Sequence, residues 1–353
     1  MNNSGYGMVG TFKIVTMAAA VEEDVVDLDN DTFYDAGSVK VDGSTLRCWK
    51  AGGHGHQTFL QVLQNSCNPG FVKIGQLLGK ERLFSYLDKF GFGSKTGIDL
   101  NGESKGIIFP LEKVGNVELA TTAFGQGVSV TPIQQVAAVS SVVNGGNLYK
   151  PYIVKNISDY ETNTIFQENK KTLIRKTISN KTSNIMKRAL ESVVALGGGK
   201  SAYIEGYRVG GKTGTAQKVK DGKYLVGNYI MSFMAVVPSN NPKAVLYLAI
   251  DNPKNTALLS SYTTTPIARR ILLDIIDALN IEKQTGELEK ELEWTDKKTY
   301  EVPDVIGRTK EEAKKLLQNF TIEYTGTGTI VVEQTPSPGE KQEEKGVVRI
   351  LLK

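Results

Sequence analysis

Three β-rich runs that lie close together late in the chain constrain its fold most strongly. They cover residues 206–219, 229–239 and 243–253, with turn residues between them, and this spacing predicts an antiparallel sheet. Apolar spacing predicts helices elsewhere, at 12–27, at 58–79 with a break at 68–70, and at 80–93, 131–146 and 264–280. A short hairpin is predicted around Asp42–Gly43. Helices, then strands, then a closing helix indicate an α+β fold in which helices cover an antiparallel sheet.

A second, smaller unit follows the closing helix. Residues 280–299 are rich in Glu and Lys, which is typical of a linker. Residues 300–353 contain one amphipathic helix at 309–317 and several short strands. A unit of this size can fold alone, although its core is small. We therefore expect a large domain over 1–279, a linker over 280–299 and an α/β module over 300–353.

Composition and charge exclude several classes of protein. The net charge is only +4, and Lys and Arg are spread along the chain, which argues against a nucleic-acid surface. No apolar run approaches the roughly 20 residues that cross a bilayer. The first residues lack the charged region and apolar core of a signal peptide. If the protein is exported or anchored, we expect the signal to lie outside this chain.

Two Lys-Thr-Gly triplets occur, at 95–97 and at 212–214. The first lies in a glycine-rich loop, whereas the second lies in a β-rich run. On a sheet edge, Lys212 would supply a cation for a ligand carboxylate, and Thr213 a hydroxyl donor. Gly214 would let an extended ligand lie against the backbone, and the amide of Thr215 could face a developing oxyanion. The simpler alternative is a glycine-rich turn.

Companion motifs favour the functional interpretation. Ser66-Cys67-Asn68 lies in a loop that breaks a helix, and Lys13 lies in an early apolar helix. Ser-x-x-Lys, Ser-x-Asn and Lys-Thr-Gly together are the signature of penicillin-binding proteins and related β-lactamases. The stretches "TFKIVTMAAA", "CWKAGGHG", "QNSCNPGF", "AFGQGVSVTPIQ" and "VGGKTGTAQK" resemble the transpeptidase domain of a class B penicillin-binding protein. The segment "VPDVIGRTKEEAKKLL" resembles the start of a PASTA module, and the whole is most similar to the sporulation-specific branch of that family.

The resemblance implies a penicillin-binding transpeptidase fold followed by a PASTA module. It implies peptidoglycan stem peptides as substrates, β-lactams as acylating ligands, and a membrane glycosyltransferase as partner. The location it implies is the extracytoplasmic face of a bacterial membrane. Neither an organic cofactor nor nucleic acid is expected.

The resemblance also implies roles for individual residues. Lys13 would be the general base, and Ser66 would relay a proton to the leaving amine. Asn68 would hold the substrate amide, while Lys212 and Thr213 would bind the terminal carboxylate. The amide of Thr215 would complete the oxyanion hole. Since a lysine base must be neutral, burial near Lys212 has to depress the pKa of Lys13.

The nucleophile of this pattern is missing. The family pattern reads "GSTFK" where this chain reads "GTFK", so either Gly10 replaces the serine three residues before Lys13, or the serine is absent between Gly10 and Thr11. Thr11 is on the wrong helical face, and no Lys follows Ser4 at the required spacing. An inactivated variant, a modified serine absent from the written sequence, and a stitched fragment all remain open. A catalytically dead scaffold that binds peptidoglycan or division partners is the competing function.

All the cysteine and histidine of the chain, two of each, lies between residues 48 and 67. Cys48, His54, His56 and Cys67 could form a tetrahedral zinc shell. The alternatives are a Cys48–Cys67 disulfide or no site at all. A closed shell would be structural and would order the neighbouring Ser66–Asn68 loop. No glutamate follows the histidines in a metalloprotease pattern, which argues against a zinc hydrolase.

Overall fold

The computed structural model describes residues 6–7, 10–220, 223–254, 260–284, 299–343 and 345–353. Most of the linker expected at 280–299, and the leader segment that contains Ser4, lie outside the described residues. No helix in the described part of the chain combines the length and the apolar character that crossing a membrane requires.

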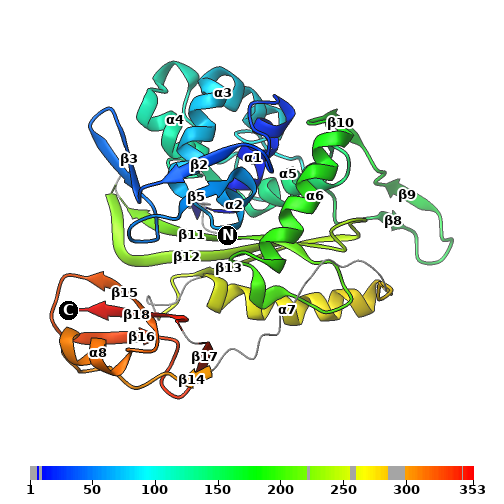
Figure 1. The fold of residues 1–353 in the computed structure, drawn as a ribbon. Coiled ribbons are helices and arrows are strands. Elements are labelled where there is room, and N and C mark those ends of the chain that lie inside the picture. Colours follow the sequence, from blue (N-terminus) through cyan, green and yellow to red (C-terminus); the bar gives the residue numbers. More distant parts are fainter. Residues whose placement is uncertain (1–5, 8–9, 221–222, 255–259, 285–298, 344) are drawn as a thin grey trace.

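The predicted antiparallel sheet forms the centre of the large domain. Its strands β11 (Gly210–Lys220), β12 (Lys223–Val237) and β13 (Ala244–Asp251) lie in the order β11-β12-β13. Helix α7 (Ser260–Ala278) covers one face, and the other helices of the domain gather on the opposite face (Figure 1). The α+β fold, with helices covering an antiparallel sheet, is therefore confirmed.

Helix α1 (Lys13–Glu22) runs through the core of the helical layer, and residues 13–21 are all buried. Its Ala-rich sequence favours a helix with no polar face, which suits a position surrounded by other helices. The helix ends at Glu22, earlier than predicted. Acidic side chains at a helix C-terminus oppose the helix dipole, and Asp24 has a left-handed φ of 48°.

The break predicted at 68–70 separates two helices. Helix α2 (Phe59–Gln64) ends before Ser66, and α3 (Asn68–Lys89) begins directly after Cys67 with Pro69 in its first turn. Gly79 has φ 73° and ψ 163° and interrupts α3. The chain thus reverses direction at Ser66, which itself has a φ of 54°.

Short antiparallel strand pairs accompany the helices of this layer. The predicted hairpin joins β3 (Ser38–Val41) and β4 (Ser44–Arg47), while β2 (Thr32–Asp35) pairs with β5 (Gly55–Thr58). The short strand β1 (Tyr6–Gly7) pairs with β6 (Ser129–Val130). The remaining helical elements of this layer are η1 (Leu111–Lys113), α4 (Asn116–Ala123), α5 (Pro132–Val143) and α6 (Asn180–Ala195), whereas η2 (Lys200–Ala202) packs against α7.

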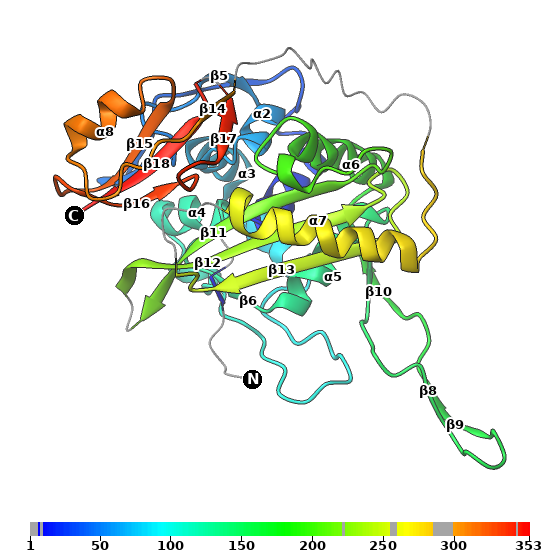
Figure 2. The same ribbon diagram turned by 90° about the horizontal axis from the view of Figure 1, so that it is seen from below.

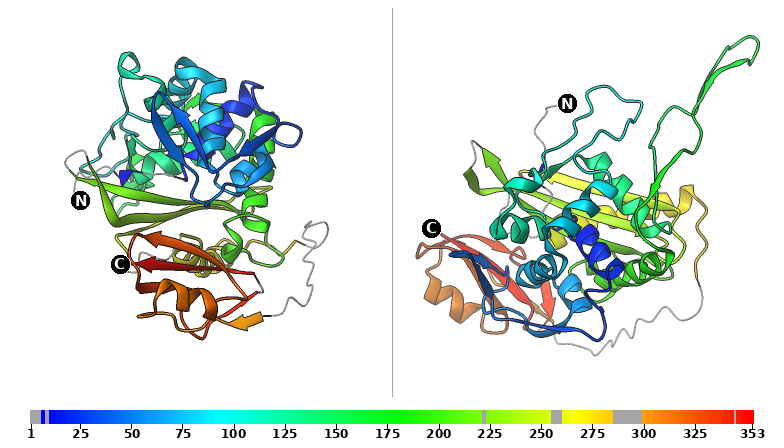
Figure 3. Two further views of the ribbon diagram at one scale, coloured as in Figure 1. Left: turned by 60° about the vertical axis from the view of Figure 1, so that its left-hand side comes forward. Right: turned by 90° about the horizontal axis from the view of Figure 1, so that it is seen from above.

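An arm projects from the domain between α5 and α6 (Figures 2 and 3). It is built from two antiparallel pairs, one of β7 with β10 and one of β8 with β9. These strands are β7 (Asn147–Tyr149), β8 (Asn156–Ser158), β9 (Ile165–Glu168) and β10 (Leu173–Lys176).

The C-terminal module has a three-stranded sheet of its own. Strand β18 (Val347–Leu352) lies between β15 (Thr321–Gly326) and β16 (Val331–Thr335). Helix α8 (Lys310–Leu316) starts at the cap residue Thr309, as predicted. Strands β14 (Thr299–Glu301) and β17 (Lys341–Glu343) form a separate pair. The module lies beside one end of the central sheet, and β18 approaches the large domain (Figures 1 and 3).

Candidate active site

Three residues that are far apart in sequence meet at one hydroxyl. Ser66 Oγ accepts hydrogen bonds from Lys13 Nζ at 3.0 Å and from Lys212 Nζ at 2.9 Å. Lys13 Nζ also donates to Ser66 O at 2.8 Å and to Asn68 Oδ1 at 2.7 Å. The first turn of α1, the α2–α3 loop and strand β11 therefore converge within bonding reach, as the sequence predicts.

Burial changes the charge of both lysines. The Lys13 side chain is 2% exposed, and desolvation lowers its pKa from 10.5 to about 7, although the charges of Cys67 and Cys48 oppose this. Burial, and then repulsion from Lys13, hold the pKa of Lys212 well below its ordinary value. A neutral amine at Lys13 is thus accessible near pH 7, which is what a proton acceptor needs.

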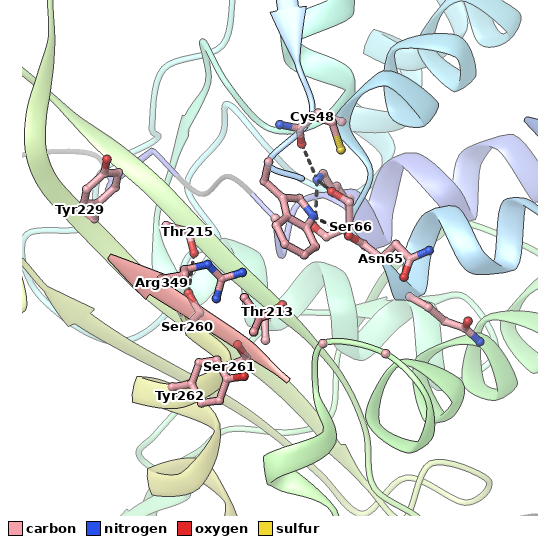
Figure 4. Close-up of a pocket in the computed structure, with 18 of the residues that line it drawn as sticks. Cys48, Asn65, Ser66, Thr213, Thr215, Tyr229, Ser260, Ser261, Tyr262 and Arg349 are labelled. Carbon is pink, nitrogen blue, oxygen red and sulfur yellow. Dashed lines mark hydrogen bonds between the residues drawn. The ribbon is translucent and has the colours of Figure 1, made fainter. Parts of the chain in front are cut away.

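Lys13, Ser66 and Asn68 line a cleft of about 700 Å³, and Lys212 is fully buried behind its wall. Thr213 and Thr215 of β11 form one side of it, and Ser66 and Asn65 form the other (Figure 4). Thr215 Oγ1 lies 2.7 Å from Ser260 Oγ. The remaining lining residues include Trp49, Tyr229, Ser261, Tyr262 and Arg349.

The two Lys-Thr-Gly triplets have different surroundings. Thr96 and Gly97 donate backbone hydrogen bonds to the carboxylate of Glu103, so the first triplet belongs to a surface loop. No residue of this first triplet lines the cleft. In the second triplet Thr213 lines the cleft, and the buried Lys212 reaches Ser66 Oγ from behind it. The geometry therefore agrees with the sequence prediction that only the second triplet has a site role.

Gly10, three residues before Lys13, is packed against β11. Its φ is 101°, and a Cβ built there would overlap the Cα of Gly214 and lie 2.6 Å from Thr213 O. Ordinary carbon contacts need about 3.5–4.0 Å. A hydroxyl-bearing side chain at this position therefore requires the segment to move away from β11.

A compact cluster of potential metal ligands lies next to the cleft. The ligand atoms of Asp35, Cys48, His54 and Cys67 all lie within 4.8 Å of one another. His54 Nδ1 is 2.9 Å from Asp35 Oδ2 and 3.3 Å from Cys48 Sγ, and Cys67 Sγ donates to Asp35 Oδ2 at 3.3 Å. Both cysteines are free thiols, so the structure contains no Cys48–Cys67 disulfide.

The predicted ligand His56 is wrong. Gly55 has a φ of 70°, so the extended conformation that would place His54 and His56 on one side does not form. His56 is exposed, and its ring packs on Tyr34 at 4.8 Å between centroids. Asp35 supplies the fourth group instead. The only sequence signal for Asp35 is that an acidic residue ends a strand. The pairing of β2 with β5 then brings Asp35 beside His54.

The ionisation of the cluster fits a cation. Hydrogen bonding with Cys67 lowers the pKa of Cys48 to about 6, and the same contact raises the pKa of Cys67. Burial opposes the charge of Asp35, but hydrogen bonds from Cys48 and His54 hold its pKa at about 2. Two sulfurs, one imidazole and one carboxylate match the ligands and the coordination number that Zn²⁺ prefers.

Cys67 links this cluster to the cleft. Its Sγ accepts a hydrogen bond from Gly70 N and caps α3, while its neighbours in sequence are Ser66 and Asn68. Any ion held by Cys67 would therefore fix the loop that positions the shared hydroxyl.

Comparison with known proteins agrees with this geometry. A family model described as "Penicillin binding protein transpeptidase domain" matches residues 3–273, and one for the PASTA domain matches residues 300–353. The chain is 53% identical over 349 residues to Stage V sporulation protein D of Bacillus subtilis, covering 99% of this chain and 54% of that protein. It is 30% identical to the peptidoglycan D,D-transpeptidase FtsI of Escherichia coli K12, over 64% of this chain and 36% of that protein.

Solved structures show the same fold. Penicillin-binding protein 3 of Mycobacterium tuberculosis, complexed with ampicillin, superposes with a TM-score of 0.74 at 27% identity, over 80% of this chain and 64% of that one. Penicillin-binding protein 2X of Streptococcus thermophilus gives a TM-score of 0.68 at 23% identity and covers 99% of this chain and 52% of that one. The chain spans about half the length of the curated relatives named above, or less.

Proposed function

Since the chain belongs to the family of penicillin-binding protein transpeptidases, we propose that its cleft serves peptidoglycan D,D-transpeptidation. In this reaction a serine attacks the carbonyl of a stem peptide, and β-lactams acylate the same serine. The observation that carries the proposal is the convergence of Lys13 and Lys212 on Ser66 Oγ, which lines one cleft.

The proposed roles follow from the contacts. A nucleophilic hydroxyl three residues before Lys13 would give its proton to neutral Lys13 as its oxygen bonds to the substrate carbonyl carbon. Ser66 would pass that proton to the leaving amine as the carbon–nitrogen bond breaks. Asn68 would hold the substrate amide, and the amide of Thr215 would face the oxyanion.

Lys212 and Thr213 would hold the terminal carboxylate. A bound carboxylate favours the charged form of a nearby amine, so ligand binding would return to Lys212 the charge that burial disfavours. Gly214 would let the extended ligand lie close to the backbone of β11.

Gly10 favours a second function for the chain as written. Without a hydroxyl at this position it would bind stem peptides or β-lactams but form no serine ester. We propose that it then acts as a scaffold that holds peptidoglycan or cell-division partners. The PASTA module, which has mixed charge, would contribute packing or protein contacts.

A fluorescent β-lactam tests both functions. The chain as written should show no covalent label by gel or intact mass, whereas a variant with Ser inserted between Gly10 and Thr11 should be labelled at the new residue. Adding Lys13→Met to that variant should slow labelling at least 100-fold, because a positioned base contributes roughly 10²–10⁴. Labelling of the unaltered chain at a serine would contradict the assignment of position 10. An insertion variant that folds but neither reacts with nor binds the β-lactam would refute the transpeptidase proposal.

We also propose that Asp35, Cys48, His54 and Cys67 hold a structural zinc ion. The donor set, the mutual separation below 4.8 Å and the burial of Asp35 and both cysteines support this. A closed four-ligand shell leaves no open position, so the ion would order the Ser66 loop and take no part in the reaction.

The two histidines provide a matched pair for the metal test. His54→Ala should abolish bound zinc in the purified protein, while His56→Ala should leave one zinc per chain. Zinc content that is zero in the parent protein prepared with added zinc, or that depends equally on both histidines, would contradict the site.

Location and partners follow from the same premise. We propose that the protein acts at the extracytoplasmic face of a bacterial membrane, is anchored there, and works with a membrane glycosyltransferase.

We also propose the division into a domain over 1–279, a linker over 280–299 and a PASTA module over 300–353. Separate expression of the two outer segments tests the division, since each should then give a cooperative unfolding transition.

A further inference from the structure

One wall of the cleft comes from the C-terminal module. Arg349 lies on β18, the middle strand of the module's sheet, and lines the same cleft as Lys13 and Ser66. In Figure 4 its guanidinium is directed into the space between the β11 edge and the Ser66 loop. A charged residue in a central strand is unusual, and the Arg349 side chain is only 8% exposed.

The guanidinium of Arg349 has unused donors. Its Nε contacts Glu323 Oε2 on the neighbouring strand at 2.7 Å. Among the described residues, no hydrogen-bond partner is recorded for its two Nη groups. Arginine carries five N–H donors, and those of the two Nη groups face the cleft. The two Nη groups are thus available to a hydrogen-bond acceptor that enters the cleft.

The plane of the guanidinium is held in place from the large domain. Its Cζ lies 5.5 Å from the ring centre of Trp49, a distance at which a cation is attracted to the ring. Trp49 Nε1 donates to Asn65 O at 2.7 Å, directly before Ser66. Arg349 is therefore fixed by Glu323 on one side and by Trp49 on the other.

The charge of the cleft selects the kind of acceptor. Its charged lining residues are Lys13 and Arg349, and none of the described lining residues is acidic. The carboxylate of Glu323 occupies only the Nε side of the guanidinium. A planar carboxylate matches the two remaining Nη donors in a bidentate arrangement, which Lys could not offer.

We propose that Arg349 and Trp49 form a second carboxylate subsite, which selects peptides that carry a side-chain carboxylate in addition to their C-terminal one. This inference rests on the proposed function, in which Lys212 and Thr213 hold the C-terminal carboxylate. It gives the C-terminal module a direct share in ligand recognition.

Two peptides that differ by one charge test the subsite. They are acetyl-L-glutamyl-D-alanyl-D-alanine and acetyl-L-glutaminyl-D-alanyl-D-alanine. The fluorescence of Trp49 reports binding in a Trp294→Phe background, because the chain has only two tryptophans. The glutamyl peptide should bind roughly tenfold more tightly, which corresponds to about 1.4 kcal/mol, because its carboxylate gains charge-assisted hydrogen bonds from Arg349 that Glu323 partly offsets.

Variants separate this inference from the function on which it rests. Arg349→Met should equalise the two affinities, and Arg349→Lys should restore only part of the preference. Lys170→Met, which removes an exposed lysine in the projecting arm, should keep the preference and controls for net charge. Lys212→Met should weaken both peptides equally.

The outcomes are distinct. Equal affinities in the parent protein, with binding still lost in Lys212→Met, would overturn the Arg349 subsite and leave the proposed function standing. A preference that survives Arg349→Met would also overturn it. Failure of both peptides to bind the parent protein at millimolar concentration would overturn the proposed function together with the subsite.

Discussion

Replacing Lys13 with methionine should change how stability depends on pH. In the folded protein the pKa of Lys13 is about 7, against 10.5 for an unburied lysine. Between these values the unfolded chain binds a proton that the folded chain does not. The free energy of unfolding must therefore rise with pH, by about 1.4 kcal/mol per unit from this residue.

The total follows from the same two values. At pH 7 the folded state carries a penalty of about 4 kcal/mol for Lys13, and this penalty disappears as pH rises above 10.5. Well below pH 7 the penalty levels off at about 5 kcal/mol, because Lys13 is protonated in both states. Lys13→Met removes the penalty but leaves Ser66 O and Asn68 Oδ1 without this donor, a loss of about 1 kcal/mol each that does not vary with pH.

Urea denaturation of the parent and Lys13→Met proteins between pH 7.5 and 10 measures the effect. The parent should gain stability relative to the variant by about 1–1.4 kcal/mol per pH unit over this range. Lys95→Met, which removes the exposed lysine of the other triplet, should follow the parent. Parallel curves for the parent and Lys13→Met would refute the buried, largely neutral lysine on which the proposed chemistry depends.

Three further outcomes are expected. In the variant with serine inserted before Thr11, β-lactam acylation should rise with pH and level off above a midpoint near 7, the pKa of Lys13; a flat profile from pH 5 to 9 would exclude lysine as the base. Gly211→Ala should lower the unfolding free energy by about 2–4 kcal/mol, because its Cβ would lie 2.5 Å from a phenylalanine ring atom and 2.6 Å from a backbone carbonyl. Gly198→Ala, whose Cβ would meet its nearest atom at 3.5 Å, should cost less than 1 kcal/mol in the same melt. Glu191→Gln should cost about 1–2 kcal/mol at pH 7, because the carboxylate accepts two hydrogen bonds from Arg208, at 2.8 and 2.7 Å; an unchanged unfolding free energy would show that water replaces them.

Local sequence signals were sufficient for the central sheet and for the cleft lysines. The β-rich runs at 206–219, 229–239 and 243–253 become β11, β12 and β13, although β11 begins later than its run, at Gly210, and β12 begins earlier, at Lys223. Alternation and turn residues act over a few positions, so they can be read without knowledge of distant contacts. The break at 68–70 could be predicted for the same reason, since Pro69 and Gly70 mark it locally.

The site residues that depend on long-range contacts could not be predicted from the sequence. Asp35 reaches His54 only because β2 pairs with β5, and His56 fails as a ligand because Gly55 takes a left-handed conformation. Arg349 enters the cleft through the packing of one module on another, which no local pattern encodes. The strands of the arm are short and exposed and carry little periodicity, so the sequence does not predict them. Helix α6 does carry local signals, since Ser179 caps it and its buried residues recur at helical spacing.

The shared hydroxyl of Ser66 makes the two lysines an electrostatic unit. Both amines lie within 3.0 Å of one oxygen, in a place that is nearly closed to solvent. An anion arriving beside Lys212 would draw a proton into this unit, so docking and proton uptake become a single event. If that proton went to Lys13, the amine could no longer act as a base. A productive ligand therefore has to place its carboxylate so that Lys212, and not Lys13, holds the added proton.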